Sequence, residues 1–468
     1  MSFPRYPEYK TSNTDFIGQV PAHWKLERLK HCAEVFPSNV DKKSVDGQVP
    51  VKLCNYTDVY YNDTIGGELG FMLATATKEQ AMRFELQQGD VVFTKDSESA
   101  DDIGVAAYVS KRLPGVVYGY HLSIARANRA AIGEFLKQYF DSQETKSYFA
   151  VSANGLTRVG LGQYAVDNAP IALPTVDEQT QIARFLEHET AKIDALIREQ
   201  ERLIVLLQEK RQAVISHAVT KGLDPSVTMK SSGVEWLGEV PEHWSIGALK
   251  RALEMVADVD HFMPTSVPEG VPYVMTGDLR SLASEIEFDL CKQVAREDFV
   301  RLARKIRTSK GDVVMARYAT IGTVSYIDID AEFVVSYSCV TIRPQAAMAT
   351  GRYLFFYFQS DAFIQGMSNM INANTQGNVG IGDLKEVKIA LPDIYEQEAT
   401  VNKLEVELTY LDGLVDEVKK TIGFMKERRS ALISAAVTGK IDVRDWQPPA
   451  DENAFNREVR EAGLEATA

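Results

Sequence analysis

The stretch Ile17-Gly-Gln-Val-Pro-Ala-His-Trp24 returns later in the chain as Leu237-Gly-Glu-Val-Pro-Glu-His-Trp244. Three further motifs return in the same order: Gly89-Asp-Val-Val92 as Gly311-Asp-Val-Val314, Ile171-Ala-Leu-Pro174 with Glu178-Gln179 as Ile389-Ala-Leu-Pro392 with Glu396-Gln397, and Ala218-Val-Thr220 as Ala436-Val-Thr438. The offset stays between 218 and 222 residues, so each copy is one structural repeat and loop insertions account for the differences. The duplication indicates two similar surfaces, as in a reader of two sites. An old duplication whose copies merely pack together is the alternative.

The first part of each copy predicts a β-rich module. Short apolar runs such as Val91-Val-Phe93 and Val313-Val-Met315 are separated by Gly-Asp, Pro-Gly and Ile-Gly pairs, which is typical of strands and turns. We expect one short amphipathic helix over Phe135–Tyr148 and another over Tyr353–Met367. The expected fold class is α+β.

The second part of each copy predicts one long helix. From about Asp177 to Thr220, and again from about Tyr395 to Thr438, no proline occurs and apolar residues repeat with a seven-residue period. At 1.5 Å per residue, each helix would extend about 65 Å. The apolar seams and their flanks include Leu186, Ile193, Gln200, Leu203 and Leu207 in the first helix, and Leu404, Leu411, Leu414, Val418 and Met425 in the second.

A helix of this length cannot bury its apolar stripe inside one module, so we expect it to pack on its own duplicate. The chain order makes an antiparallel coiled coil natural, with one module at each end and Gln200 setting the register. Ordinary amphipathic core helices are the alternative, but they leave the length unexplained. The predicted segments are a first module, 1–174, a first helix, 175–221, a second module, 222–392, a second helix, 393–440, and a polar acidic tail, 441–468.

The composition is that of a globular chain, with 45% hydrophobic and 25% charged residues among 468. No apolar run is long enough for a membrane span, and MSFPRYPEYK lacks the layout of a signal peptide. The four cysteines form no Cys-x-x-Cys pair, which favours a reducing cytoplasm without a zinc site or disulfide framework. The net charge of −14, taken alone, argues against a nucleic-acid binder.

Candidate catalytic motifs are weak throughout the chain. Gly160-Leu-Gly162 and Gly380-Ile-Gly382 are too short for a phosphate-binding loop, and we expect tight turns before the last strand of each module. His23 and His243 are expected to pack beside the neighbouring tryptophans instead of binding metal. Glu386-Val-Lys388 lacks the second carboxylate of a nuclease motif and is expected on a surface strand. We therefore predict no catalytic residue and no metal ligand in this chain.

Basic residues are the strongest candidates for a binding function. Six cations lie between Arg296 and Lys310, where a solvated helix face is an equally good interpretation. Lys95 and Arg317 follow the two Gly-Asp-Val-Val motifs at matching places. Such side chains can contact phosphates or, for arginine, guanine edges in a major groove. The candidate DNA-binding residues are Lys95, Arg126, Arg158, Arg301, Arg304, Lys305, Arg307 and Arg317.

In their doubled order, these motifs resemble those of the DNA-specificity subunits of type I restriction-modification systems. The resemblance covers nearly the whole chain and includes the stretch Ala316-Arg-Tyr-Ala-Thr-Ile-Gly322 and the stretch Ala436-Val-Thr-Gly-Lys-Ile-Asp442. It implies that each module is a target-recognition domain that reads one half of a split DNA sequence in the major groove, while an antiparallel coiled coil fixes the unread spacer. The first module departs from the pattern, because Lys95-Asp-Ser-Glu98 replaces Ala-Arg-Tyr-Ala.

The resemblance also implies partners and no activity of the chain's own. Two modification subunits, which use S-adenosylmethionine to methylate adenine, would dock on it, and ATP-dependent restriction subunits would join the assembly. S-adenosylmethionine, ATP and Mg²⁺ would then belong to those partners, and this chain would bind no cofactor. An alternative is a non-enzymatic coiled-coil adaptor whose β-rich modules bind proteins. The net acidity favours that alternative, while the basic run and the order of the motifs oppose it.

Overall fold

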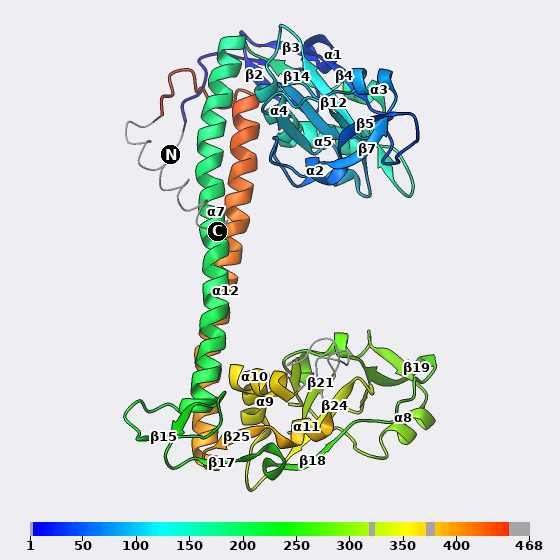
Figure 1. Cartoon of the computed structure of the whole chain (residues 1–468). Coiled ribbons are helices and arrows are strands. Elements are labelled where there is room, and N and C mark those ends of the chain that lie inside the picture. Colours follow the sequence, from blue (N-terminus) through cyan, green and yellow to red (C-terminus); the bar gives the residue numbers. More distant parts are fainter. Residues whose placement is uncertain (1–2, 318–322, 371–379, 449–468) are drawn as a thin grey trace. The chain divides into compact units, whose positions relative to one another are not determined.

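The computed structural model describes residues 3–317, 323–370 and 380–448 (Figure 1). It divides into two compact units: unit 1 comprises residues 1–200 and 420–468, and unit 2 comprises residues 201–419. Each unit holds a β-rich module, the beginning of the long helix that follows this module, and the end of the long helix of the other copy. We call the β-rich parts module 1 and module 2.

Module 1 is built on a five-stranded sheet that contains the Gly-Asp-Val-Val motif in its third strand. The strand order is β4 (Ala33–Pro37), β12 (Leu122–Ala127), β8 (Asp90–Thr94), β10 (Ala106–Val109) and β6 (Thr64–Ile65). A three-stranded sheet has the order β11 (Val116–Tyr118), β5 (Val49–Cys54) and β7 (Met72–Ala76). Val91 and Phe93 of β8 pack in one core cluster and Val92 in another, since successive side chains of a strand point to opposite faces.

Module 2 repeats this plan with four of the strands. Its main sheet has the order β18 (Leu253–Ala257), β24 (Cys339–Pro344), β21 (Val313–Ala316) and β22 (Val324–Tyr326). A second sheet has the order β20 (Lys292–Val294), β19 (Ser266–Val274) and β23 (Val334–Val335), and α8 (Arg296–Leu302) follows β20. Val313 and Met315 face one core and Val314 the other, as in β8. The strands β4, β12, β8 and β10 of module 1 are therefore equivalent, in this order, to β18, β24, β21 and β22 of module 2.

Smaller elements complete both modules. In module 1 they are β1 (Tyr9–Thr11), β2 (Gln19–Pro21), β3 (Lys25–Arg28), α1 (Leu29–Cys32), α2 (Tyr56–Tyr60), α3 (Lys78–Arg83), β9 (Asp96–Ser97), β13 (Val159–Gly160), α6 (Gln163–Asp167) and β14 (Pro170–Leu173). In module 2 they are β15 (Met229–Ser231), β16 (Glu239–Pro241), β17 (Ser245–Ala248), α11 (Ile381–Glu386) and β25 (Lys388–Leu391). The last strand of each module pairs with an early one, β14 with β3 and β25 with β17, so each module closes on itself.

The short amphipathic helix predicted in each module is in fact two helices. Module 1 has α4 (Gly133–Asp141) and α5 (Gln143–Ser152), and module 2 has α9 (Gly351–Gln359) and α10 (Asp361–Met370). The break falls on Ser142, whose backbone is extended and whose hydroxyl accepts a hydrogen bond from the Thr145 amide at 3.3 Å. Ser360 accepts one from the Phe363 amide in the same way. A serine cap ends one helix and starts the next without changing the apolar pattern, so the periodicity concealed the break.

The Gly-x-Gly segments were also predicted imperfectly. Gly160 ends the short strand β13, and Gly162 is the N-cap of α6, which precedes the last strand β14. Gly380 is likewise the N-cap of α11, which precedes β25. Each segment thus leads into a short helix instead of turning directly into the last strand. The local sequence cannot distinguish the two cases, because glycine is favourable both in turns and at N-caps.

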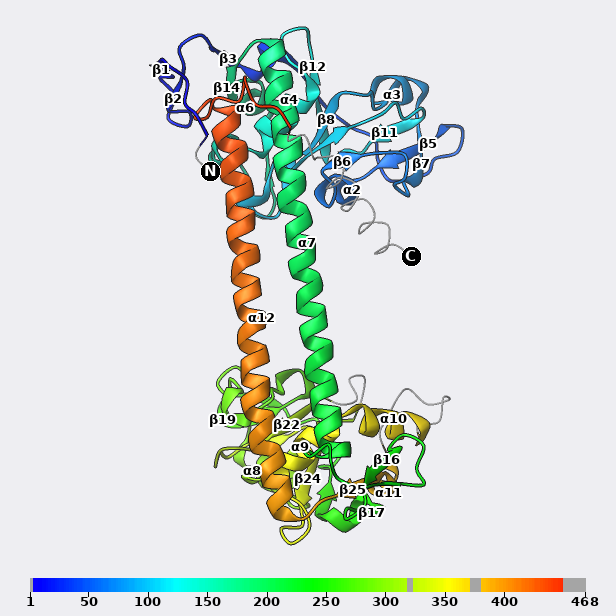
Figure 2. The ribbon, with the colours of Figure 1, turned by 90° about the vertical axis from the view of Figure 1, so that its left-hand side faces the viewer.

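The two long helices are α7 (Val176–Lys221) and α12 (Ile394–Val437). In unit 1 the beginning of α7 and the end of α12 lie side by side (Figure 2), and Arg429 Nε lies 2.9 Å from Asp194 Oδ1. In unit 2 the equivalent pair is Arg211 Nε and Asp412 Oδ1, at 3.2 Å. Within each unit the end of one helix therefore runs beside the beginning of the other, which is an antiparallel arrangement.

The predicted seam residues divide by burial. Those that are buried are Leu186, Ile193, Leu404 and Leu411, and those that are half-buried are Gln200, Leu207, Leu414, Val418 and Met425. Leu203 differs, since 38% of its surface is exposed in the chain alone. Leu404 and Leu411 pack in the same cluster as Ile215 of α7. No helix in the described part of the chain combines the length and the apolar character that a membrane span requires.

Candidate nucleic-acid interface

The repeated His-Trp pair binds the glutamate at the start of its long helix. In unit 1 the Trp24 Nε1 donates to Glu178 Oε1 at 3.0 Å, and His23 Nε2 lies 3.0 Å from Glu178 Oε2. In unit 2 Trp244 and His243 bind Glu396 at 3.0 and 2.8 Å. The two histidines thus help to anchor the starts of α7 and α12. The repeated His-Trp motif corresponds to this contact in both units.

The glutamine that follows each glutamate ties the helix start to its module. The buried Gln179 Nε2 donates to Pro174 O at 3.0 Å and Ala130 O at 2.9 Å, and its Oε1 accepts from the Ile132 amide at 3.0 Å. In unit 2, Gln397 makes the equivalent three bonds with Pro392, Met348 and Thr350. A buried amide with all these bonds satisfied is a structural group. The repeated Glu-Gln motif is therefore assigned to the scaffold.

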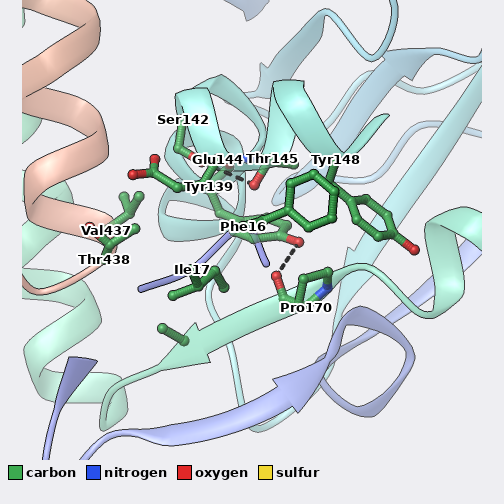
Figure 3. Close-up of a pocket in the computed structure, with 11 residues that line it drawn as sticks. Phe16, Ile17, Tyr139, Ser142, Glu144, Thr145, Tyr148, Pro170, Val437 and Thr438 are labelled. Carbon is green, nitrogen blue, oxygen red and sulfur yellow. Dashed lines mark hydrogen bonds between the residues drawn. The ribbon is translucent and has the colours of Figure 1, made fainter. Parts of the chain in front are cut away.

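The end of each long helix docks on the module of the other copy. In unit 1 Ser434 Oγ accepts from the Gln143 amide at 2.8 Å, and in unit 2 Ser216 Oγ accepts from the Asp361 amide at 2.9 Å. Beside the unit 1 contact lies a small pocket (Figure 3) with Phe16, Ile17, Tyr148 and Val437 in its lining. In this pocket the Tyr139 hydroxyl donates to Pro170 O at 2.8 Å. Its mainly apolar lining belongs to the docking of α12 on module 1.

Arg126 is held inside module 1. Its Nε and Nη2 donate to the two carboxylate oxygens of Asp90, each at 2.7 Å, and the Asp90 side chain is 1% exposed. Arg343 makes the same bidentate pair with Asp312 in module 2, at 2.9 and 2.8 Å. Both aspartates belong to the Gly-Asp-Val-Val motifs. Because a buried carboxylate needs this partner, we assign Arg126 a structural role instead of the predicted DNA contact.

Lys95 and Arg158 come together in module 1, in a cluster that we call corner 1. It consists of Lys95, Asp96, Tyr120, His121 and Arg158 and lies where β8 ends and β12 begins. Asp96 Oδ2 accepts hydrogen bonds from Lys95 Nζ at 2.8 Å and from His121 Nδ1 at 2.9 Å. Burial acts to raise the pKa of Asp96, but these two hydrogen bonds outweigh it and hold the pKa below its ordinary value. The carboxylate therefore stays charged and fixes both neighbours.

Module 2 has a related but smaller cluster, corner 2, formed by Asp258, His261, Arg317 and Tyr337. Arg317 stands at the position of Lys95, since its amide donates to Ser338 O at 2.9 Å as the Lys95 amide does to His121 O at 3.0 Å. The mostly buried Arg317 guanidinium pairs with Asp258. The His261 and Tyr337 rings stack at 5.0 Å, and the Tyr120 and His121 rings lie at 3.9 Å. Residues 318–322, the rest of the stretch from Ala316 to Gly322, lie outside the described residues.

The predicted basic run borders corner 2. Lys305 Nζ lies 3.0 Å from Asp260, and the Arg301 guanidinium lies 4.2 Å from the centre of the Phe262 ring, so both contact the loop that carries His261. Arg307 pairs with Glu332 at 2.8 Å. Arg304 is exposed and has no ion-pair partner within residues 3–317, 323–370 and 380–448. In this basic run, Lys305 and Arg307 are therefore paired with carboxylates, whereas Arg304 is not.

Sequence reasoning missed several members of these sites. Asp96, His121, Asp258 and His261 occupy no matched positions in the two copies, so the repeat gives no indication of them. Tyr120 and Tyr337 could have been found, because each lies two residues before its equivalent strand, β12 or β24. In the part of the chain that the structure describes, no three His, Cys, Asp or Glu side chains are grouped to hold a metal ion.

Known proteins resemble the chain over nearly its whole length. The model of the type I restriction modification DNA specificity domain matches residues 264–412. The protein assigned as specificity subunit of the MjaX type I restriction enzyme of Methanocaldococcus jannaschii is 22% identical, over 94% of this chain and 98% of the relative. The EcoKI specificity subunit of Escherichia coli K12 is 20% identical, over 92% and 91%.

A solved structure shares the fold. A chain from work on complex assembly and conformational transition of the type I R-M system superposes with a TM-score of 0.64 at 17% identity, covering 90% of this chain and 99% of that chain. The family model, the relatives and the doubled motifs agree, which confirms the resemblance seen in the sequence. Over more than nine tenths of its length, the chain is thus similar to specificity subunits of type I restriction-modification systems.

Proposed function

We propose that this chain is the DNA-recognition subunit of its restriction-modification complex and reads a bipartite, asymmetric target. The observation that carries the proposal is the pair of corners: in each module, a cation at the end of the equivalent strand lies in a cluster with an aspartate, a histidine and a tyrosine. The first corner holds Lys95 and the second Arg317 at the same backbone position. The flanking residues differ between the modules, so each module would read a different half-sequence.

The acidity of the chain is compatible with this role. A DNA-binding protein needs local positive charge where it meets the duplex, and contacts to phosphates supply most of the sequence-independent affinity. We propose that Lys95, Arg158 and the run Arg301, Arg304, Lys305, Arg307 supply the local charge beside the two corners, and that partner subunits contribute further phosphate contacts. The net charge of −14 then describes one subunit of an assembly.

The long helices would separate the two readers. We propose that α7 and α12 form an antiparallel coiled coil between domains 1–174 and 222–392, and that its length sets the number of unread base pairs. Two modification subunits and the restriction subunits would dock on the assembly, and these would carry S-adenosylmethionine, ATP and Mg²⁺. This chain would contribute recognition and no catalysis.

Methylome sequencing tests the proposal. The chain is co-expressed with its modification subunit in a host without other adenine methylation, and the modified sites are mapped. A methylated motif of two different short sequences separated by a fixed number of unspecified bases is expected. The modification subunit alone, as the control, should leave the genome unmethylated. A continuous motif, or the same motif without this chain, would refute the proposal.

A further inference from the structure

Corner 1 contains one exposed arginine, Arg158, on a loop that backbone hydrogen bonds hold closed. It lies in a short loop between α5 and β13, and residues 159 and 160 pair with β9, the strand that carries Asp96. The loop closes through two backbone hydrogen bonds between Asn154 and Gly160, at 3.1 and 2.9 Å. Gly155 has a φ of +147°, and a Cβ there would lie 2.0 Å from Arg158 O, so only glycine lets the loop close this tightly.

The side chain of Arg158 is oriented by a hydrogen-bond relay. Asp96 is an acceptor, so His121 Nδ1 carries the proton in their 2.9 Å bond. Arginine can only donate, so the other ring nitrogen, Nε2, is the acceptor in its 3.5 Å contact with Arg158 Nη1. Asp96 is itself fixed by Lys95 at 2.8 Å. The hydrogen-bond relay from Lys95 through Asp96 to His121 thus ends at one edge of the exposed Arg158 guanidinium.

The opposite edge of this guanidinium remains available to a ligand. An arginine carries five N–H donors in a planar fork, and the relay uses one of them. No carboxylate of the described residues forms an ion pair with Arg158, in contrast to the bidentate pair that holds Arg126. The neighbouring Leu156 is fully exposed, so the loop projects from the module. A preorganised fork on a projecting loop can make two parallel hydrogen bonds to one planar acceptor.

We propose that Arg158 reads a guanine in the half-site of module 1, with His121 as its positioning residue. The O6 and N7 atoms of guanine form the planar acceptor pair that an arginine fork matches in a major groove. A phosphate also accepts a fork, but an exposed, mobile side chain would suffice for it, and the relay would add nothing. This inference rests on the proposed function and assigns one base contact within it.

The test compares methylomes of complexes that carry Arg158→Lys, Arg158→Ala or the matched control Arg129→Ala. Arg129 is an exposed cation of the same module that follows the other end of β12. Lysine keeps the charge but loses the fork. Both Arg158 variants should lower the preference for one G·C pair of one half-site by about 10- to 100-fold, the range of a bidentate base contact. Arg129→Ala should leave the motif unchanged.

The second half-site, read in the same experiment, reports whether the complex is intact. His121→Phe keeps a ring but removes the acceptor, and it should relax the same base pair as Arg158→Lys. An unchanged half-site in Arg158→Ala overturns the inference. The inference is also overturned if Arg158→Lys keeps the wild-type base preference while Arg158→Ala weakens binding to all sequences equally. That result would assign Arg158 to a phosphate contact. If the wild-type complex yields no bipartite motif, the proposed function fails before any variant is compared.

Discussion

Gly439, just after the end of α12, provides a sensitive test of how the second helix docks on module 1. Its φ is +73°, and a Cβ at this position would lie 2.3 Å from Pro21 Cδ and 3.2 Å from the Trp24 ring. Gly115 has the same φ of +73° in a turn of module 1, but a Cβ there would meet nothing within 4 Å. The two glycines therefore share the backbone cost of an added side chain and differ in the steric cost.

Gly439→Ala should destabilise unit 1 more than Gly115→Ala does. The left-handed backbone conformation costs a non-glycine residue about 1–2 kcal/mol at either position. At Gly439 the clash with Pro21 adds an overpacking cost of about 1–3 kcal/mol. Gly222, which follows α7 in unit 2, has a φ of +76°, and its nearest contact would be the Trp244 ring at 3.4 Å. Its substitution should therefore resemble that of Gly115.

Chemical unfolding of the three purified variants, followed by tryptophan fluorescence, measures these differences. Trp24 and Trp244 lie in separate units, so the signal covers both regions. The expected order of destabilisation is Gly439→Ala first, with Gly222→Ala and Gly115→Ala similar and smaller. Equal unfolding midpoints for Gly439→Ala and Gly115→Ala would show that Pro21 does not pack against the end of α12, and would refute the docking described for unit 1.

Three further predictions concern the ion pairs, the basic run and the helices. Arg126→Ala should lower the free energy of unfolding by about 3–5 kcal/mol, because it leaves the buried Asp90 without a partner. Lys305→Ala, which removes an exposed ion pair, should change the free energy of unfolding by less than about 1 kcal/mol, and equal effects of the two variants in denaturant titrations would contradict the structural role of Arg126. Arg304→Ala and Arg307→Ala should each weaken duplex binding by the assembled complex and reduce the slope of log affinity against log salt by about one, while an unchanged slope would assign the run to a solvated surface. Inserting seven residues in both α7 and α12 should change the number of unread base pairs in the methylated motif, and an unchanged spacer would refute the role proposed for the helices.

The sequence alone determined the elements that depend on local spacing. The predicted helices, from about Asp177 to Thr220 and from about Tyr395 to Thr438, agree within one residue with Val176–Lys221 and Ile394–Val437. A seven-residue apolar period and the absence of proline specify a helix within a few turns, without reference to the rest of the chain. The repeat was equally accessible, because it needs only a comparison of the chain with itself.

The tertiary structure decided what each polar side chain does. Arg126 was a plausible DNA contact in the sequence, but strand pairing brings it to Asp90, 36 residues away, which neutralises it. Arg158 has no repeated counterpart among the described residues, yet the pairing of β13 with β9 places it at the end of a relay from Lys95. The role of a charged residue depends on the partner that folding places beside it, and that partner is often distant in sequence. Periodicity reports what is near along the chain, so the helices could be predicted and the partners could not.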